Sequence, residues 1–192
     1  MKTKILVTVL TLGLSLAGRA QAVDIQFYSD AIIDNGDVYD NVFVYDTPPD
    51  HTTVDMWGGS IGGPGTHNSS TFNLYGGEIR AGMGLSDSST VNIYDGSVEG
   101  TFWVMDSAWL NIYGGDVSLA SPSFSELSTV NIFGYDFAYD GWEVTGFLSD
   151  HSAFGINEVG FDDYSHMNLV VIPEPATVFL LAVGALALKK RR

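Results

Sequence analysis

Two kinds of side chain recur at a regular spacing along this chain, and both could recognise a sugar. In most repeats an asparagine is followed, after one apolar residue, by an aromatic residue. An aromatic ring offers a flat apolar face and an amide offers a donor and an acceptor, which together match the apolar faces and hydroxyl rims of sugar rings. The candidate glycan-facing residues are Trp57, Tyr75, Tyr94, Tyr113, Asn73, Asn92 and Asn111.

The same recurrence also has a structural explanation, which we favour over ligand binding. Amides stacked on amides and rings stacked on rings stabilise a parallel β-sheet without any ligand. If the rings do bind a glycan, replacing Tyr75 and Tyr94 with alanine abolishes glycan retention while the fold survives. Retention that is unchanged in this double variant would exclude the aromatic column as the binding surface.

The charged residues argue against an enzyme. Between positions 23 and 172 the chain has 22 acidic residues and one basic residue, Arg80, a net charge of −21. A β-helical polysaccharide lyase needs Arg or Lys to stabilise its enolate-like intermediate, whereas so many carboxylates make a glycosidase-like pair a matter of chance. No long insertion is available to wall a cleft. We therefore expect no catalytic activity, with a small β-helical carbohydrate-active enzyme as the alternative.

Zinc chemistry and cofactor binding are not expected. The chain has no cysteine, and its histidines do not have the spacing of a zinc site. These histidines are His51, His67, His151 and His166. The closest grouping is a weak one, in which Asp162 and Asp163 lie near His166 in sequence and His151 could join them.

Weak calcium binding is the remaining metal hypothesis. Asp116 and Asp136 are expected to share a column in adjacent repeats, and the segment 30–40 contains four aspartates. Stacked carboxylates repel each other unless a cation lies between them. Neither group has the spacing of a known calcium loop, so a solvated acidic surface is the simpler interpretation.

The elements that position these side chains form a repeat. Five segments align without gaps, and their starts are 18, 19, 19 and 20 residues apart. They are residues 54–61, 72–79, 91–98, 110–117 and 130–137. Alternation within each segment predicts strands whose first and third residues face inward and whose second and fourth face outward. A glycine pair or near-pair then predicts a turn, followed by an inward column of Ile61, Ile79, Val98, Val117 and Phe137.

The repeat length is compatible with two all-β architectures. In a parallel β-solenoid each repeat is one coil, and identical residues stack; in an antiparallel meander each repeat is a hairpin. The matching columns favour a short, right-handed β-helix-like solenoid with coils of about 19 residues, and the segments resemble the repeats of secreted β-helix passenger-type proteins. Residues 23–52 and 138–170 are expected to cap its ends, with strand candidates at 41–45, 141–148 and 166–171. The alternative for the strand at 41–45 is a degenerate first coil. Gly82 and Gly84 are assigned to a loop between repeats.

The N-terminus has the pattern of a secretory signal. A start containing Lys2 and Lys4 is followed by an apolar stretch over residues 5–17 and by Ala20-Gln21-Ala22. This order of charged, apolar and small residues predicts a signal helix over residues 1–22, removed by signal peptidase after Ala22.

The C-terminus carries a second signal over residues 173–192. Pro173, Glu174 and Pro175 precede an apolar run, 176–188, and a basic cluster of Lys189, Lys190, Arg191 and Arg192. A helix over this run is about 20 Å long, short for a bilayer core of about 30 Å. Its basic end would stay in the cytoplasm and leave the acidic body, residues 23–172, outside.

This tail resembles that of the PEP-CTERM proteins of Gram-negative bacteria, which consists of Pro-Glu-Pro, a short transmembrane run and a basic cluster. The resemblance implies sorting by exosortase, a membrane enzyme that cuts near the motif, in bacteria that make exopolysaccharide. It covers only the last 20 or so residues and does not describe the cargo.

These observations predict an exported, non-catalytic protein. The precursor would be anchored in the inner membrane, and the mature form would lie at the cell surface or outside the cell, with a structural or adhesive role in an exopolysaccharide or biofilm matrix. Extracellular polysaccharide is a candidate partner, and a carbohydrate-binding module is the alternative. Nucleic acid is excluded as a partner because phosphate binding needs clustered Lys and Arg.

Overall fold

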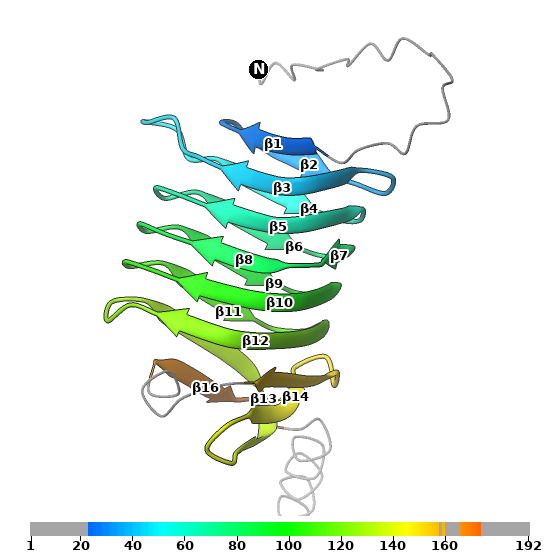
Figure 1. Cartoon of the computed structure of the whole chain (residues 1–192), viewed down its shortest axis with the longest axis vertical. Helices are drawn as coiled ribbons and strands as arrows, with labels where there is room; N and C mark the ends of the chain where they lie inside the picture. The colour runs from blue at the N-terminus through cyan, green and yellow to red at the C-terminus, as the bar shows by residue number, and fades with distance from the viewer. Residues whose placement is uncertain (1–22, 158, 160–165, 174–192) are drawn as a thin grey trace, which may run out of the picture.

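The computed structural model describes residues 23–157, 159 and 166–173, and these residues form a parallel β-solenoid of about six coils. Figure 1 shows the strands stacked as successive rungs, with β1 and β2 at one end and β13, β14 and β16 at the other. The strands within each stack pair in parallel, which decides between the two predicted architectures in favour of the solenoid.

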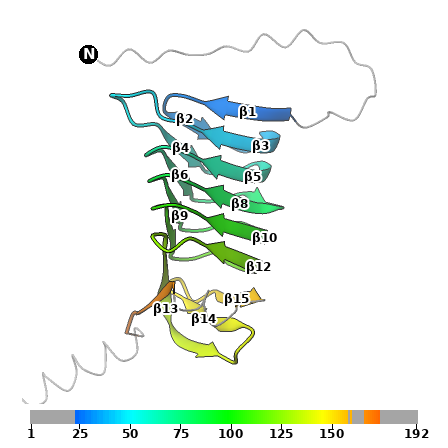
Figure 2. The same cartoon turned by 60° about the vertical axis from the view of Figure 1, so that its left-hand side comes forward.

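Each central coil contributes one strand to each of two faces. The short-strand face stacks β2 (Ala31–Ile33), β4 (Thr53–Met56), β6 (Thr71–Leu74), β9 (Thr90–Ile93), β11 (Trp109–Ile112), β13 (Thr129–Tyr139) and β16 (Met167–Val171). The long-strand face stacks β1 (Val23–Phe27), β3 (Val38–Val44), β5 (Ser60–Thr66), β7 (Glu78–Ile79) with β8 (Gly82–Leu85), β10 (Ser97–Val104), β12 (Asp116–Phe124) and β15 (Ala153–Asn157). Figure 2 shows the two faces from the side.

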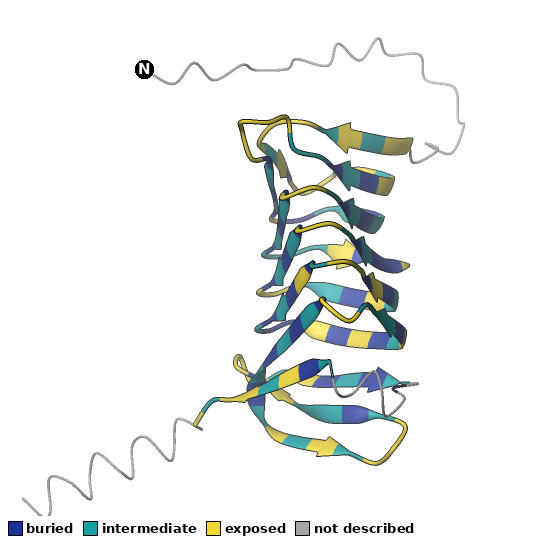
Figure 3. Ribbon diagram, turned by 90° about the vertical axis from the view of Figure 1, so that its left-hand side faces the viewer, coloured by how far each residue is buried: buried dark blue, intermediate teal, exposed yellow. Residues whose placement is uncertain are grey.

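Alternating side chains fill the space between the two faces. The predicted inward columns are fully buried on the short-strand face, as are three of the five predicted members on the long-strand face, and Val117 is nearly so. The short-strand members are Val54, Phe72, Val91, Leu110 and Val130 with Met56, Leu74, Ile93, Ile112 and Ile132. Burial bands of this kind run along the rungs below the terminal strand β1 in Figure 3, so the core continues through most of the length of the solenoid.

The predicted glycine turns lie between the two faces. Their second glycines, Gly59, Gly77, Gly96 and Gly115, all have positive φ angles. At Gly77 a Cβ would also lie 2.7 Å from the Met56 side chain and 2.8 Å from the Gly58 backbone. The turn column is therefore fixed both by backbone conformation and by close packing between coils.

The last predicted repeat is wrong in its second half. Val130 and Ile132 keep the register of the short-strand face, but β13 does not turn at Gly134 and continues, with an irregularity between Tyr135 and Ala138, to Tyr139. Phe137 therefore does not join the inward column, and Phe154 of β15 pairs with Val117 in its place.

The two ends of the solenoid differ. At the C-terminal end β14 (Val144–Leu148) pairs antiparallel with both β13 and β15 and joins the two faces, so the predicted closure is present. At the N-terminal end β1 and β2 pair in parallel with β3 and β4, so this region is the beginning of the solenoid itself, as the alternative of a degenerate first coil predicts, and not a separate cap.

Candidate functional site

The asparagine column is a continuous ladder of amide hydrogen bonds. Each Asn Nδ2 donates to the Oδ1 of the previous coil, with distances of 2.8–2.9 Å from Asn92, Asn111 and Asn131. Asn73 ends the ladder by donating to Asp55, and Asn168 of β16 extends it by donating to Asn131 at 3.0 Å. The ladder was predicted, but Asn168 was missed because it lies outside the repeat.

The aromatic column is a continuous stack of rings. Successive ring centroids from Trp57 through Tyr75, Tyr94 and Tyr113 to Phe133 are 4.2–5.0 Å apart, with interplanar angles of 4–14°. The three tyrosines therefore have both ring faces covered by neighbouring rings. Contact between these residues and a glycan stays a prediction, and any such contact would have to use ring edges, or the outer face of Trp57.

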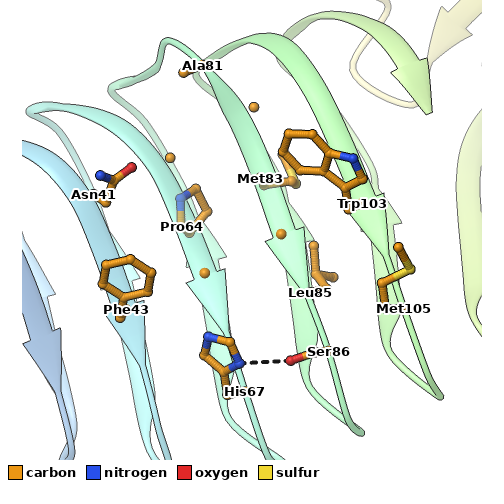
Figure 4. Close-up of a pocket in the computed structure, with 14 residues that line it drawn as sticks. Asn41, Phe43, Pro64, His67, Ala81, Met83, Leu85, Ser86, Trp103 and Met105 are labelled. Carbon is orange, nitrogen blue, oxygen red and sulfur yellow. Dashed lines mark hydrogen bonds between the residues drawn. The ribbon is translucent and has the colours of Figure 1, made fainter. Parts of the chain in front are cut away.

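A different concave surface lies on the long-strand face. It is a largely apolar groove of about 380 Å³, lined from β3, β5, β8 and β10 and the residues that follow them. We call it the glycine groove because Gly63, Gly65, Gly82 and Gly84 are among its lining residues. Figure 4 shows Phe43 and Trp103 on opposite sides of it.

The groove exists because one outward column lacks side chains in two consecutive coils. Strand register aligns Phe43 with Gly65, Gly65 with Gly84, and Gly84 with Trp103. The Phe43 ring leans over Gly65, since a Cβ there would be 2.9 Å from the ring. At Gly84 no atom lies within 4 Å of the Cβ position, so this position is the open part of the groove.

Polar atoms are found along one end of the groove. His67 stacks on Tyr45 at 4.7 Å, and its Nδ1 is hydrogen-bonded to the Ser86 hydroxyl at 2.8 Å. The His67 Nε2 atom lies 3.6 Å from the Cβ position of Gly65 and is therefore turned toward the groove. Asn41 adds an amide at another part of the lining, as Figure 4 shows.

The lining includes no Asp, Glu, Lys or Arg. Arg80, which precedes the lining residue Ala81, donates its guanidinium hydrogen bonds to the carbonyl oxygens of Ile61 and Tyr39 on neighbouring rungs. The groove is thus a neutral surface on a strongly acidic body.

Within the described part of the chain, no group of three or more acidic or histidine side chains is placed to hold a metal ion. Asp116 and Asp136 do not share a column, because β13 leaves the repeat register before Asp136 and β15 stacks on β12. His151 instead bonds the Tyr135 hydroxyl at 2.8 Å through Nδ1. Asp162 and Asp163 lie outside the described residues.

The loop assignment of Gly82 and Gly84 is wrong, because both lie in β8. The groove residues Gly84 and Trp103 were missed because the segments between the repeats contain glycine and proline and do not resemble one another. Phe43 lies in the predicted strand 41–45, but no groove was predicted beside it. The available signal was spacing, since Gly65, Gly84 and Trp103 lie 11, 12 and 12 residues after the starts of their repeats.

The predicted signal helix and cleavage residues Ala20 and Ala22 lie outside the described residues, as does the sorting tail after Pro173. Among the described residues no helix is long and apolar enough to cross a bilayer. A sequence model of the PEP-CTERM protein-sorting motif matches residues 171–192. No curated protein and no solved structure matches the chain. The motif indicates an exported protein with a membrane-anchored precursor that exosortase processes.

Proposed function

We propose that this protein, with its PEP-CTERM sorting motif, acts outside the cytoplasm as a non-catalytic structural or adhesive element of the exopolysaccharide matrix. The observation that carries the proposal is the sorting motif at residues 171–192. In the proposed route, signal peptidase removes residues 1–22, exosortase processes the tail, and the acidic solenoid remains at the cell surface or in the extracellular polymer.

The architecture of the described residues supports a structural role. A solenoid whose faces are held by repeated hydrogen bonds and stacked rings is a stiff rod, and its length grows with the number of coils. The net charge of −21 over residues 23–172 keeps such a rod soluble and prevents close association between copies.

The chemistry of the glycine groove supports a non-catalytic role. General acid–base catalysis at a glycosidic bond needs a pair of carboxyl groups beside the bound sugar. The lining of the groove includes no carboxylate, and its one titratable ring, His67, is hydrogen-bonded to Ser86. These residues are suited to binding rather than to bond cleavage.

Intact mass together with localisation in the native host tests the proposal. We expect a product that begins at Val23, ends near Pro173 and fractionates with the extracellular polymer, and we expect deletion of the gene to reduce the polymer retained by cells. A chain that stops at residue 172 serves as the control, since it should be exported but not sorted. A product that retains Arg192 and stays in the inner membrane would contradict the proposal.

A further inference from the structure

We propose that the glycine groove between Phe43 and Trp103 is a binding site for one pyranose unit of a neutral polysaccharide. This inference rests on the proposed function for its setting, the extracellular polymer, but its evidence is separate and lies in the described residues of β3, β5, β8 and β10.

The steric argument starts from the empty position over Gly84. Adjacent rungs of a parallel stack are about 4.8 Å apart, so a six-membered ring over Gly84 would be about one rung from Trp103. It would be a similar distance from Phe43, whose ring leans over Gly65. Ring-to-ring contacts are favourable at centroid separations of about 4.5–7 Å, so a sugar ring there continues the stacking that two glycines interrupt.

The accessible rings are in the groove rather than in the predicted aromatic column. Trp103 has 46% of its surface exposed, and no ring stacks on it among the described residues. Tyr75, Tyr94 and Tyr113 stack on each other and have no free face. Sugar C–H groups bind ring faces, so the groove is the better surface for this contact.

The polar atoms of the groove suit hydroxyl groups. The Nε2 atom of His67 faces the groove, while Nδ1 is fixed by Ser86, so the imidazole ring is held in one orientation. The Asn41 amide already donates one N–H to Asp24 at 2.8 Å, which leaves its second N–H and its carbonyl oxygen for a ligand hydroxyl. Together with the apolar walls these groups match a ring that is apolar on its faces and polar at its edge.

Charge and size select the class of ligand. The lining has no charged side chain, and the acidic body repels anionic polymers, so the ligand is expected to be neutral. A volume of about 380 Å³ lies in the range of small-ligand sites. A second copy of the chain would have to bury about 800 Å² per partner for a stable dimer, and the groove is too small to supply this.

Affinity electrophoresis of the full-length chain in detergent tests the inference. The gels contain dextran, galactomannan or hydroxyethyl cellulose as neutral probes and alginate as the anionic probe. We expect at least one neutral polymer to retard the protein and alginate to have no effect. Absence of retardation by all three neutral polymers would overturn the inference and leave the proposed export and matrix role untouched.

Two variants test the location of the site. Trp103→Ala removes one wall, and Gly84→Val fills the open position without removing any contact, so each should weaken binding about tenfold or more, a loss of about 1.4 kcal/mol. Trp109→Ala is the matched control, because Trp109 is equally exposed, at 47%, but lies on the short-strand face. Circular dichroism and thermal unfolding confirm that the variants are folded.

Each result assigns the groove or excludes it. Retardation lost in Trp103→Ala and Gly84→Val but kept in Trp109→Ala supports the inference. Retardation kept in Gly84→Val, or lost only when Tyr75 and Tyr94 are replaced with alanine, would overturn it in favour of another surface. If Gly84→Val alters the sedimentation of the protein instead of its polymer binding, the groove is a contact between copies and the inference is wrong.

Discussion

The two faces of the solenoid are built by the same coils, yet only one of them is uniform. On the short-strand face the outward positions repeat from coil to coil. Each amide is hydrogen-bonded to the amide of the next coil, and each ring stacks on the next ring. On the long-strand face the corresponding positions change from Phe43 to two glycines and then to Trp103. A column whose side chains bond to or stack on one another stabilises the solenoid. A column in which glycines replace the side chains leaves exposed surface that a ligand can contact.

The largest loss of stability is expected from substitutions in the core that lies between the two faces. Phe72 on β6 is fully buried, and Phe72→Ala should lower the free energy of unfolding by about 3–5 kcal/mol, because a large cavity remains between the faces. Chemical denaturation measures this loss. Trp109→Ala, at an exposed position on the next-but-one coil, is the control and should change stability by less than about 1 kcal/mol.

The next largest change in stability is expected to differ between two glycines of β8, Gly82 and Gly84. Gly82 has a φ of +96°, and a Cβ there would overlap the Thr101 carbonyl, so Gly82→Ala should destabilise the protein by about 2–3 kcal/mol. Gly84 has open space at its Cβ position, and Gly84→Ala should raise stability by about 0.5 kcal/mol.

Thermal unfolding of the two variants side by side measures the difference. Equal destabilisation by both substitutions would mean that β8 needs glycine throughout, and that the opening over Gly84 is a by-product of backbone geometry. Opposite signs would mean that only Gly82 is required by the fold, which leaves Gly84 available for the groove.

The contrast between the faces also explains what the sequence could predict. Val91, Asn92 and Ile93 match their counterparts in neighbouring coils, so strand, register and facing follow from the alignment alone. On β8 and β10 the outward residues do not match, since Gly84 pairs in register with Trp103, and the backbone hydrogen bonds between the rungs form with either residue. Because glycine usually indicates a turn, Gly82 and Gly84 made β8 look like a loop in the sequence.

The C-terminal end was misread for a different reason. Residues 134–137 resemble the turn of the earlier repeats, but Gly134 has no glycine after it, and β13 continues to pair with β14. A local match cannot show which strand will be the neighbour. The closure and a strand at 141–148 were predicted, but the antiparallel pairing of β14 with β13 and β15 was not, because it depends on these non-local contacts.

A smaller effect is expected from interrupting the amide ladder. Asn92 donates to Asn73 and accepts from Asn111, so Asn92→Leu leaves two partly buried amide groups without their partner and should cost about 1–3 kcal/mol. Asn168→Leu, at the exposed end of the ladder, removes a single bond and should cost less than about 1 kcal/mol. Urea unfolding of both variants measures the gap, and equal losses would show that the ladder has no continuity.

The smallest effect concerns the loop that fixes the closed end to the turn between the faces. Although partial burial raises the pKa of Asp150, hydrogen bonds from the Ser152 hydroxyl and from the backbone N–H groups of Gly115 and Ser152 lower it more, and the net pKa lies below the ordinary value of 3.8. The folded state therefore favours the carboxylate. Its stabilising contribution is complete above pH 3.8 and is lost as the pH falls through the lowered pKa.

Unfolding of the native chain and of Asp150→Asn between pH 7 and pH 2 isolates this contribution from the other carboxylates. The native chain should be the more stable of the two at pH 7, and the difference should shrink only below pH 3.8. A difference that is constant with pH would mean that the Gly115 N–H and the Ser152 groups bond an amide as well as they bond the carboxylate. The β14–β15 loop would then be bound to the turn at Gly115 by hydrogen bonds that do not depend on the charge of Asp150. The amide ladder of the short-strand face is held by uncharged hydrogen bonds of the same kind.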